Sequence, residues 1–335
     1  MLFLHYGVKR IYNITNMWRC DMDRKEMKEK WMDDSTDFLK NIFQEIEKIC
    51  NDLNLNNYED DIAARSTVEF LAEWLRFLDG IMLLFIQGRV DVAQVLTRSL
   101  YEITLQLLYL IKDKETMNKK AICYVAFSEL KKYSTNNNMI KNKNKIGVDT
   151  SKGEIENKKI LESLGSSKNE ELRFLYKYFL DKGLVDKDLK NDSWYSVYEQ
   201  YCQDKSNGIK DKKIKNISTS ILCEKVGFYS EEKGEKILVN TIVYNELSRQ
   251  AHGVNARDSL KVIGGVQKFR NYDCLQNGLW QLSLIEEMKF LIIIYCYCMF
   301  EEKLGKISDE TYSRLYKVKM DLDLLSKDLK ALYIF

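Results

Sequence analysis

The stretch VAQVLTRSLYEITLQLLYLI, residues 92–111, decides the fold. Apolar residues cover nearly the whole circumference of a helix built from it, which predicts a helix buried at the centre of a bundle. Polar residues nevertheless recur there at intervals of four, namely Gln94, Arg98, Glu102 and Gln106. Residues four apart lie on the same side of a helix, so the sequence predicts a polar stripe along a buried helix.

Arg98 and Glu102 place two charges in the middle of this apolar stretch. Burying two charged groups lowers stability unless they pair with each other or form hydrogen bonds, and it is also tolerated where the charges bind a ligand or take part in catalysis. Arg98 precedes Glu102, which is the weaker order for an ion pair within a helix. Stabilisation of the isolated helix is therefore a poor explanation for this pair.

A second stripe lies in TIVYNELSRQAHG, residues 241–253, where Tyr244, Ser248 and His252 recur every four residues. Gly253 stands where a helix C-cap is expected, so His252 would lie at a helix end that favours a cation. The chain has only two histidines, and His5 is less suited because its surroundings predict no element.

The two stripes have two interpretations. In the first, they form a buried hydrogen-bonded network that joins two helices and fixes their register. In the second, a cation, a carboxylate, an imidazole and hydroxyls form an anion-binding or acid/base site. The residues alone leave both open.

The rest of the chain predicts an all-α fold. Proline is absent from all 335 residues, which favours long uninterrupted helices. No strand is required, although the sequence is compatible with short strands near residues 217–230. Besides the segment 91–113, helices are predicted at 18–53, 61–87, 117–133, 169–182, 193–203, 237–252, 275–304 and 309–332.

Residues 131–160 are dominated by Lys, Asn, Ser and Gly and predict a mobile loop. Its lysines at 131, 132, 141, 143 and 145 have no acidic residue between them, so they are candidates for contacts with phosphate. A solvated insertion without a ligand is the alternative.

Several classes of protein are argued against. A net charge of +2 supplies no general attraction to nucleic acid or anionic lipid. Eight scattered cysteines without a signal peptide suit reduced thiols in the cytoplasm. The most apolar run, residues 290–300, is bracketed by Lys289 and Glu301 and is too short for a membrane span of about 20 residues. Nucleotide-binding loops and common zinc motifs are missing, so no cofactor or metal is predicted.

Three short motifs carry a resemblance: RSLYE at 98–102, WYSVYEQ at 194–200 and YNELSRQAHG at 244–253. Together they resemble the bacterial domain-of-unknown-function family numbered 5677, whose helical core is similar to the HEPN superfamily. The resemblance covers about residues 35–300. It implies a HEPN-like helical bundle over residues 35–304, with an N-terminal extension at 1–34, a flexible insertion near 131–160 and a C-terminal helix at 305–335.

The resemblance also implies function. Many HEPN-like proteins are metal-independent ribonucleases of stress or antiphage defence, often dimeric, with partner proteins from the same operon. Their usual motif is Arg, four to six residues, then His, whereas Arg249 precedes His252 by three positions. Arg98 would then supply the guanidinium from another helix.

In that hypothesis His252, Arg98 and Glu102 are catalytic, and RNA is the substrate. Tyr244, Ser248, Arg249 and Trp194 would contact it. The alternative hypothesis is a non-catalytic helical sensor or adaptor with a structural polar network. A third is a bundle that binds a small molecule or nucleotide through Arg98.

Overall fold

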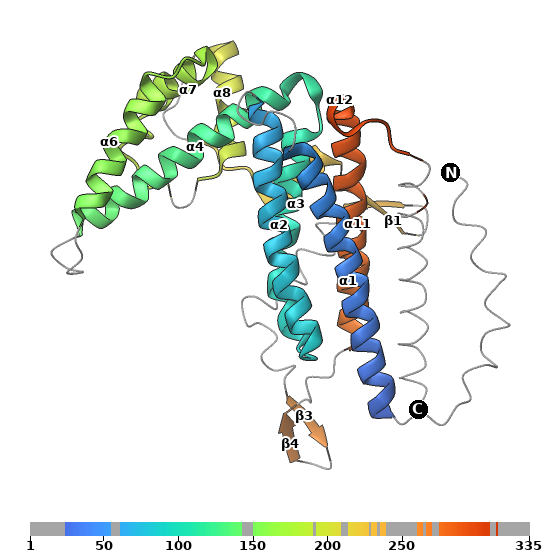
Figure 1. The fold of residues 1–335 in the computed structure, drawn as a ribbon. Coiled ribbons are helices and arrows are strands. Elements are labelled where there is room, and N and C mark those ends of the chain that lie inside the picture. The colour runs from blue at the N-terminus through green and yellow to red at the C-terminus, as the bar shows by residue number, and fades with distance from the viewer. Residues whose placement is uncertain are drawn as a thin grey trace.

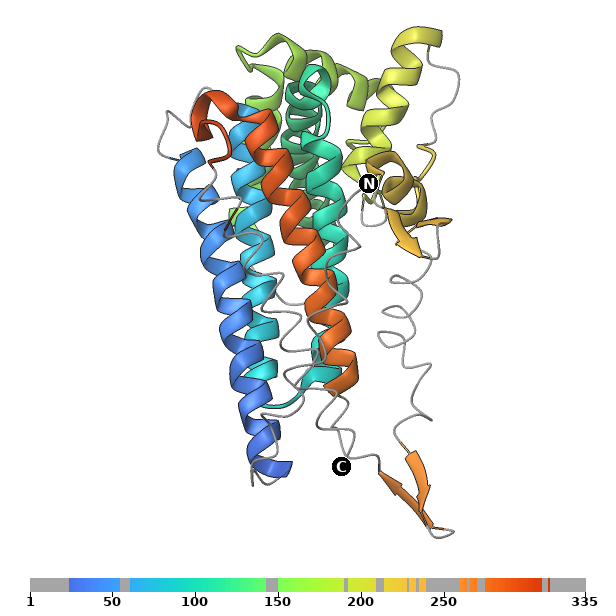
Figure 2. The same ribbon diagram turned by 90° about the vertical axis from the view of Figure 1, so that its right-hand side faces the viewer.

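A four-helix bundle forms the centre of the computed structural model (Figures 1 and 2). Its helices are α1 (Arg24–Asn54), α2 (Ile62–Ile86), α3 (Val90–Ile111) and α11 (Leu275–Met299). α2 packs against α1 and α3, and α11 closes the bundle against the same two helices. The structure describes residues 24–54, 61–142, 150–189, 192–208, 214–227, 229–232, 235–238, 260–263, 266–269, 275–308 and 313.

Side-chain hydrogen bonds in the interior align α3 with its two neighbours. Trp74 Nε1 of α2 donates to Thr104 Oγ1 over 2.9 Å. On the other side, Gln281 of α11 donates through Nε2 to the Val90 carbonyl over 2.8 Å and accepts from Thr97 Oγ1 over 2.9 Å. Buried polar groups stabilise a core when each has a partner, so these bonds help to fix the register of the bundle.

Gly278 allows α11 to approach α1 and α3 closely. A Cβ atom at this position would lie 2.6 Å from Trp31 Cη2 and 2.8 Å from Val90 Cγ1. Contacts this short are not tolerated, so a side chain here would push α11 away from the bundle.

A second group of helices forms an arm that extends from the bundle (Figure 1). It consists of α4 (Lys114–Lys141), α6 (Ser151–Gly165), α7 (Glu170–Asp181) and α8 (Trp194–Asn207). The shorter elements are α9 (Thr219–Val226), which packs on α3, and α12 (Glu301–Leu304). Two antiparallel hairpins complete the described elements: β1 (Tyr229–Glu232) with β2 (Glu235–Leu238), and β3 (Leu260–Ile263) with β4 (Val266–Phe269).

A buried ion pair ties α7 to α8 within the arm. Lys182 Nζ lies 2.6 Å from Asp204 Oδ2, and the Tyr178 hydroxyl donates to the same oxygen over 2.7 Å. Burial raises the pKa of Asp204, but hydrogen bonds from Lys182, Tyr178 and Gln200 outweigh it and hold that pKa below its usual value. The carboxylate therefore stays charged and keeps the two helices together.

The all-α fold class predicted from the sequence is confirmed, with the hairpins as small additions. The predicted helices at 61–87, 91–113, 169–182 and 275–304 are present with small changes at their ends. The helix predicted at 18–53 is α1 in its described part, and the one at 193–203 is α8, which extends to Asn207. The C-terminal helix predicted at 309–332 lies outside the described residues except at residue 313.

The loop predicted at residues 131–160 is wrong for most of that range. α4 continues to Lys141, and α6 begins at Ser151. The polar composition concealed a packed face, because polar side chains make the contacts there: Ser134 Oγ donates to the Lys187 carbonyl over 3.1 Å and accepts from the Leu189 amide over 3.3 Å. Apolar residues at the two ends of this range, among them Leu130 and Ile160, are buried as well.

The helix predicted at 237–252 is wrong at its start. Ile237 lies in β2 and pairs with Ser230 of β1. Residues 239–259 lie outside the described residues. The domain boundary predicted at residue 34 falls inside α1, which is continuous from Arg24 to Asn54. None of the described helices has the length and apolarity needed to cross a membrane.

A charged cluster is buried between α1 and α11. The fully buried Lys289 ammonium lies 2.9 Å from Glu286 and 3.2 Å from Glu45 of α1. An ammonium in this position balances the negative charge of two carboxylates that are poorly solvated.

Lys289→Ala is expected to lower the free energy of unfolding by about 3–5 kcal/mol, because it leaves buried carboxylates without their cation. Urea unfolding followed by circular dichroism measures the change. The control is Lys30→Ala, since Lys30 pairs with Asp34 on the exposed surface of α1 and its removal should change little. Equal effects of the two substitutions would show that the buried cluster contributes no more than a surface pair.

Candidate functional site

The polar stripe of α3 is present as the sequence predicted, and its exposure changes along the helix. Gln94 is 2% exposed. One turn on, the Arg98 side chain is 19% exposed, and one turn further the Glu102 side chain is 38% exposed. The stripe thus emerges from the core towards solvent at its charged residues.

Arg98 and Glu102 form an ion pair within α3. The Arg98 Nε atom donates to Glu102 Oε1 over 3.1 Å. This bond forms although Arg precedes Glu, the weaker order on a helix surface. It holds the guanidinium along the helix, half-buried beside a carboxylate that solvent reaches.

The end of the stripe at Gln106 has a structural role. Trp194 Nε1 of α8 donates to Gln106 Oε1 over 2.9 Å. The Trp194 ring is 4% exposed and packs against the rings of Phe70, Tyr109 and Tyr124. The structure therefore places Trp194, which the sequence suggested as a substrate contact, in the core between the arm and the bundle.

The C-terminal part of α3 is also held by satisfied polar contacts. The Tyr109 hydroxyl donates to Glu199 Oε1 over 2.5 Å, and Lys225 of α9 lies 3.0 Å from the same oxygen. Burial and the hydrogen bond to Glu199 raise the pKa of Tyr109 far above its usual value. Tyr109 thus remains a neutral donor near neutral pH, which suits a structural tie between α3 and α8.

The residues of the second stripe lie outside the described part of the chain. They are Tyr244, Ser248, Arg249 and His252. Their approach to Arg98 and Glu102 therefore stays a prediction. The structure places one half of the predicted site, on α3.

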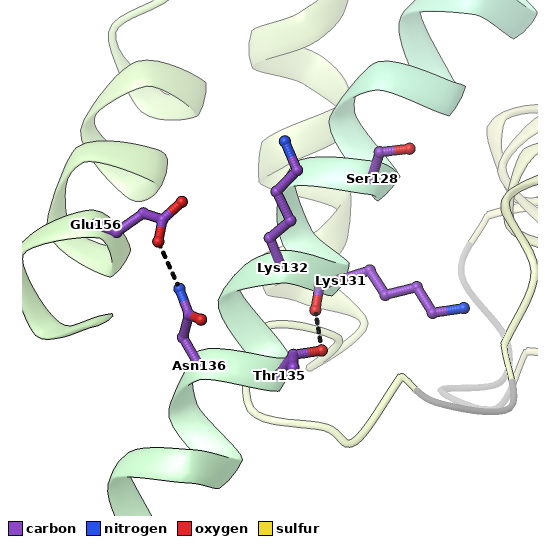
Figure 3. A pocket seen from close by; sticks show the side chains of 6 residues that line it. All are labelled: Ser128, Lys131, Lys132, Thr135, Asn136 and Glu156. Atoms are coloured by element: carbon purple, nitrogen blue, oxygen red, sulfur yellow. Dashed lines mark hydrogen bonds between the residues drawn. The ribbon is translucent and has the colours of Figure 1, made fainter. Parts of the chain in front are cut away.

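The Lys-rich segment forms an open groove of about 350 Å³ on the arm (Figure 3). Its lining comes from α4 and, through Glu156, from α6. Asn136 Nδ2 donates to Glu156 Oε2 over 3.2 Å, and Thr135 Oγ1 donates to the Lys131 carbonyl over 3.0 Å. In Figure 3 the side chains of Lys131 and Lys132 point in different directions.

The electrostatics of this groove do not favour phosphate. Lys132 lies 2.6 Å from Glu129, an acidic residue that precedes the run of lysines on α4. The Glu156 carboxylate lines the same groove and would repel an anion. Lysines 143 and 145 lie outside the described residues. We therefore take the α3 stripe as the candidate site.

Metal ligands are not gathered in the described part of the chain: no group of three or more His, Cys, Asp or Glu is placed there to hold an ion. The Arg98 guanidinium can bind an anion, and the bond to Glu102 fixes its orientation. Proton transfer near neutral pH requires a further group, for which the sequence offers His252.

A model of the family of unknown function DUF5677 matches residues 65–261, more than half of the chain. The chain belongs to this family. The matched range begins within α2 and ends in β3, so it includes α3 and all three motifs on which the resemblance was based. No curated protein and no solved structure matches this DUF5677 protein.

Sequence reasoning missed how differently the members of the stripe behave. Spacing placed four residues on one side of α3 but did not distinguish the bonded Gln106 from Gln94, whose Oε1 atom is buried without a hydrogen-bond partner. The signal for Gln106 was the distant Trp194, a residue that buries its ring well only when its N–H has an acceptor. No local pattern marked Gln94.

Trp194→Phe is expected to lower the free energy of unfolding by about 1–2 kcal/mol, because it removes the hydrogen bond to Gln106 and leaves that oxygen without its donor. Thermal or urea unfolding measures the loss, and affinity for an RNA oligonucleotide should stay within about twofold. An unchanged stability together with a large loss of RNA affinity would instead indicate that Trp194 contacts the RNA.

Proposed function

We propose that this DUF5677 protein is a HEPN-like protein that binds RNA through Arg98 and cleaves it without a metal ion. The observation that carries the proposal is the Arg98–Glu102 pair, whose side chains are 19% and 38% exposed on a central helix that is mostly apolar. Charges in such a helix lower stability relative to apolar residues of similar volume. Their presence favours a role in binding.

Arg98 would bind phosphoryl oxygens of the RNA backbone. A guanidinium offers two donors in a fixed plane to a phosphate, and its Nε can at the same time bind a carboxylate. The 3.1 Å bond from Nε to Glu102 fixes that plane. Glu102 is thus a positioning residue, and its partial exposure leaves the ligand side of the pair accessible to solvent.

His252 would supply the acid/base chemistry. As a base it takes the proton from a ribose 2′-hydroxyl, the 2′-oxygen attacks the adjoining phosphorus, and the bond from phosphorus to the 5′-oxygen breaks. The departing 5′-oxygen takes a proton from water, which leaves a cyclic phosphate and a 5′-hydroxyl, and His252 returns its proton to the solvent. Arg98 would stabilise the charge that develops on the phosphoryl oxygens, and Tyr244, Ser248 and Arg249 would contact the RNA.

The biological setting belongs to the same proposal. A cytoplasmic homodimer acting in stress or antiphage defence would place two sites together, and a partner protein from the same operon would control them. This setting is supported by the resemblance of the three sequence motifs to a family with a HEPN-like core, whereas the family model that matches the chain has no assigned function.

A non-catalytic sensor or adaptor is the second candidate. The bond between Gln106 and Trp194 favours it, because part of the stripe is a satisfied structural network. In that case Arg98 and Glu102 continue this network, and a protein surface rather than RNA is the ligand.

The first test is RNA cleavage by the full chain in the presence of EDTA. Arg98→Ala and His252→Ala are each expected to lower the rate at least about 100-fold, since acid/base and electrostatic contributions are of this size. Arg98→Lys should recover little, because an ammonium lacks the planar donor pair. The matched control is Arg65→Ala, which removes an exposed Arg–Glu pair at the same spacing on α2.

Thermal unfolding of the same variants separates the two candidates. A binding role predicts a melting temperature within about 2 °C of the wild type for Arg98→Ala, whereas a structural network predicts a fall of several degrees. Cleavage that is equal in all variants would remove the catalytic role, and a large fall in melting temperature without any RNA binding would favour the adaptor.

A further inference from the structure

We draw no further inference here: the strongest candidate, the apolar surface patch around the turn between α2 and α3 where Leu83, Ile86, Val92 and Val95 are exposed, is an unpartnered face, and nothing in the described part of the chain shows what covers it.

Discussion

The ion pair between Arg98 and Glu102 is the constraint on which the account depends. α3 packs against both α2 and α11, so its side chains decide how the bundle is assembled. Two charges in such a helix are tolerated because they bond to each other and because solvent reaches Glu102. The bundle provides a rigid support on which a guanidinium is held in a fixed orientation.

The neighbouring contacts make that support rigid. Gln281 and Trp74 fix α3 from two sides through buried hydrogen bonds. Trp194 joins the arm to the bundle at the far end of the stripe. A site on such a support keeps its geometry without a ligand. This favours binding, because little conformational entropy is lost when the ligand binds.

Much of the fold could be predicted from the sequence, because it depends on local patterns. The apolar circumference of residues 92–111 identified the central helix, and the four-residue spacing placed the stripe correctly on one face. In the arm, only the loop predicted at 131–160 is wrong, since polar side chains take part in the packing there: Ser134 of α4 bonds to the segment after α7, and Asn136 of α4 bonds to Glu156 of α6. β2 was missed because the apolar residues of its four-residue strand also fit a helical pattern.

The site was harder to predict than the fold, because burial depends on distant partners. Nothing near Trp194 in the sequence indicates that its ring lies in the core against α3, and nothing near Gln94 indicates that its oxygen lacks a donor. The carboxylates near the arm lysines are another case. Glu129, the partner of Lys132, precedes them by a few residues, but Glu156 reaches the groove only because α6 packs on α4.

The central claim is that Arg98 and His252 act on one ligand from two segments of the chain. A double-mutant cycle on the RNA cleavage rate, with Arg98→Ala and His252→Ala alone and together, tests it most directly. Residues that act as a unit give non-additive effects, so the double variant should be little slower than the slower single variant, with a coupling energy of about 1–3 kcal/mol. Strictly additive effects would contradict a shared site.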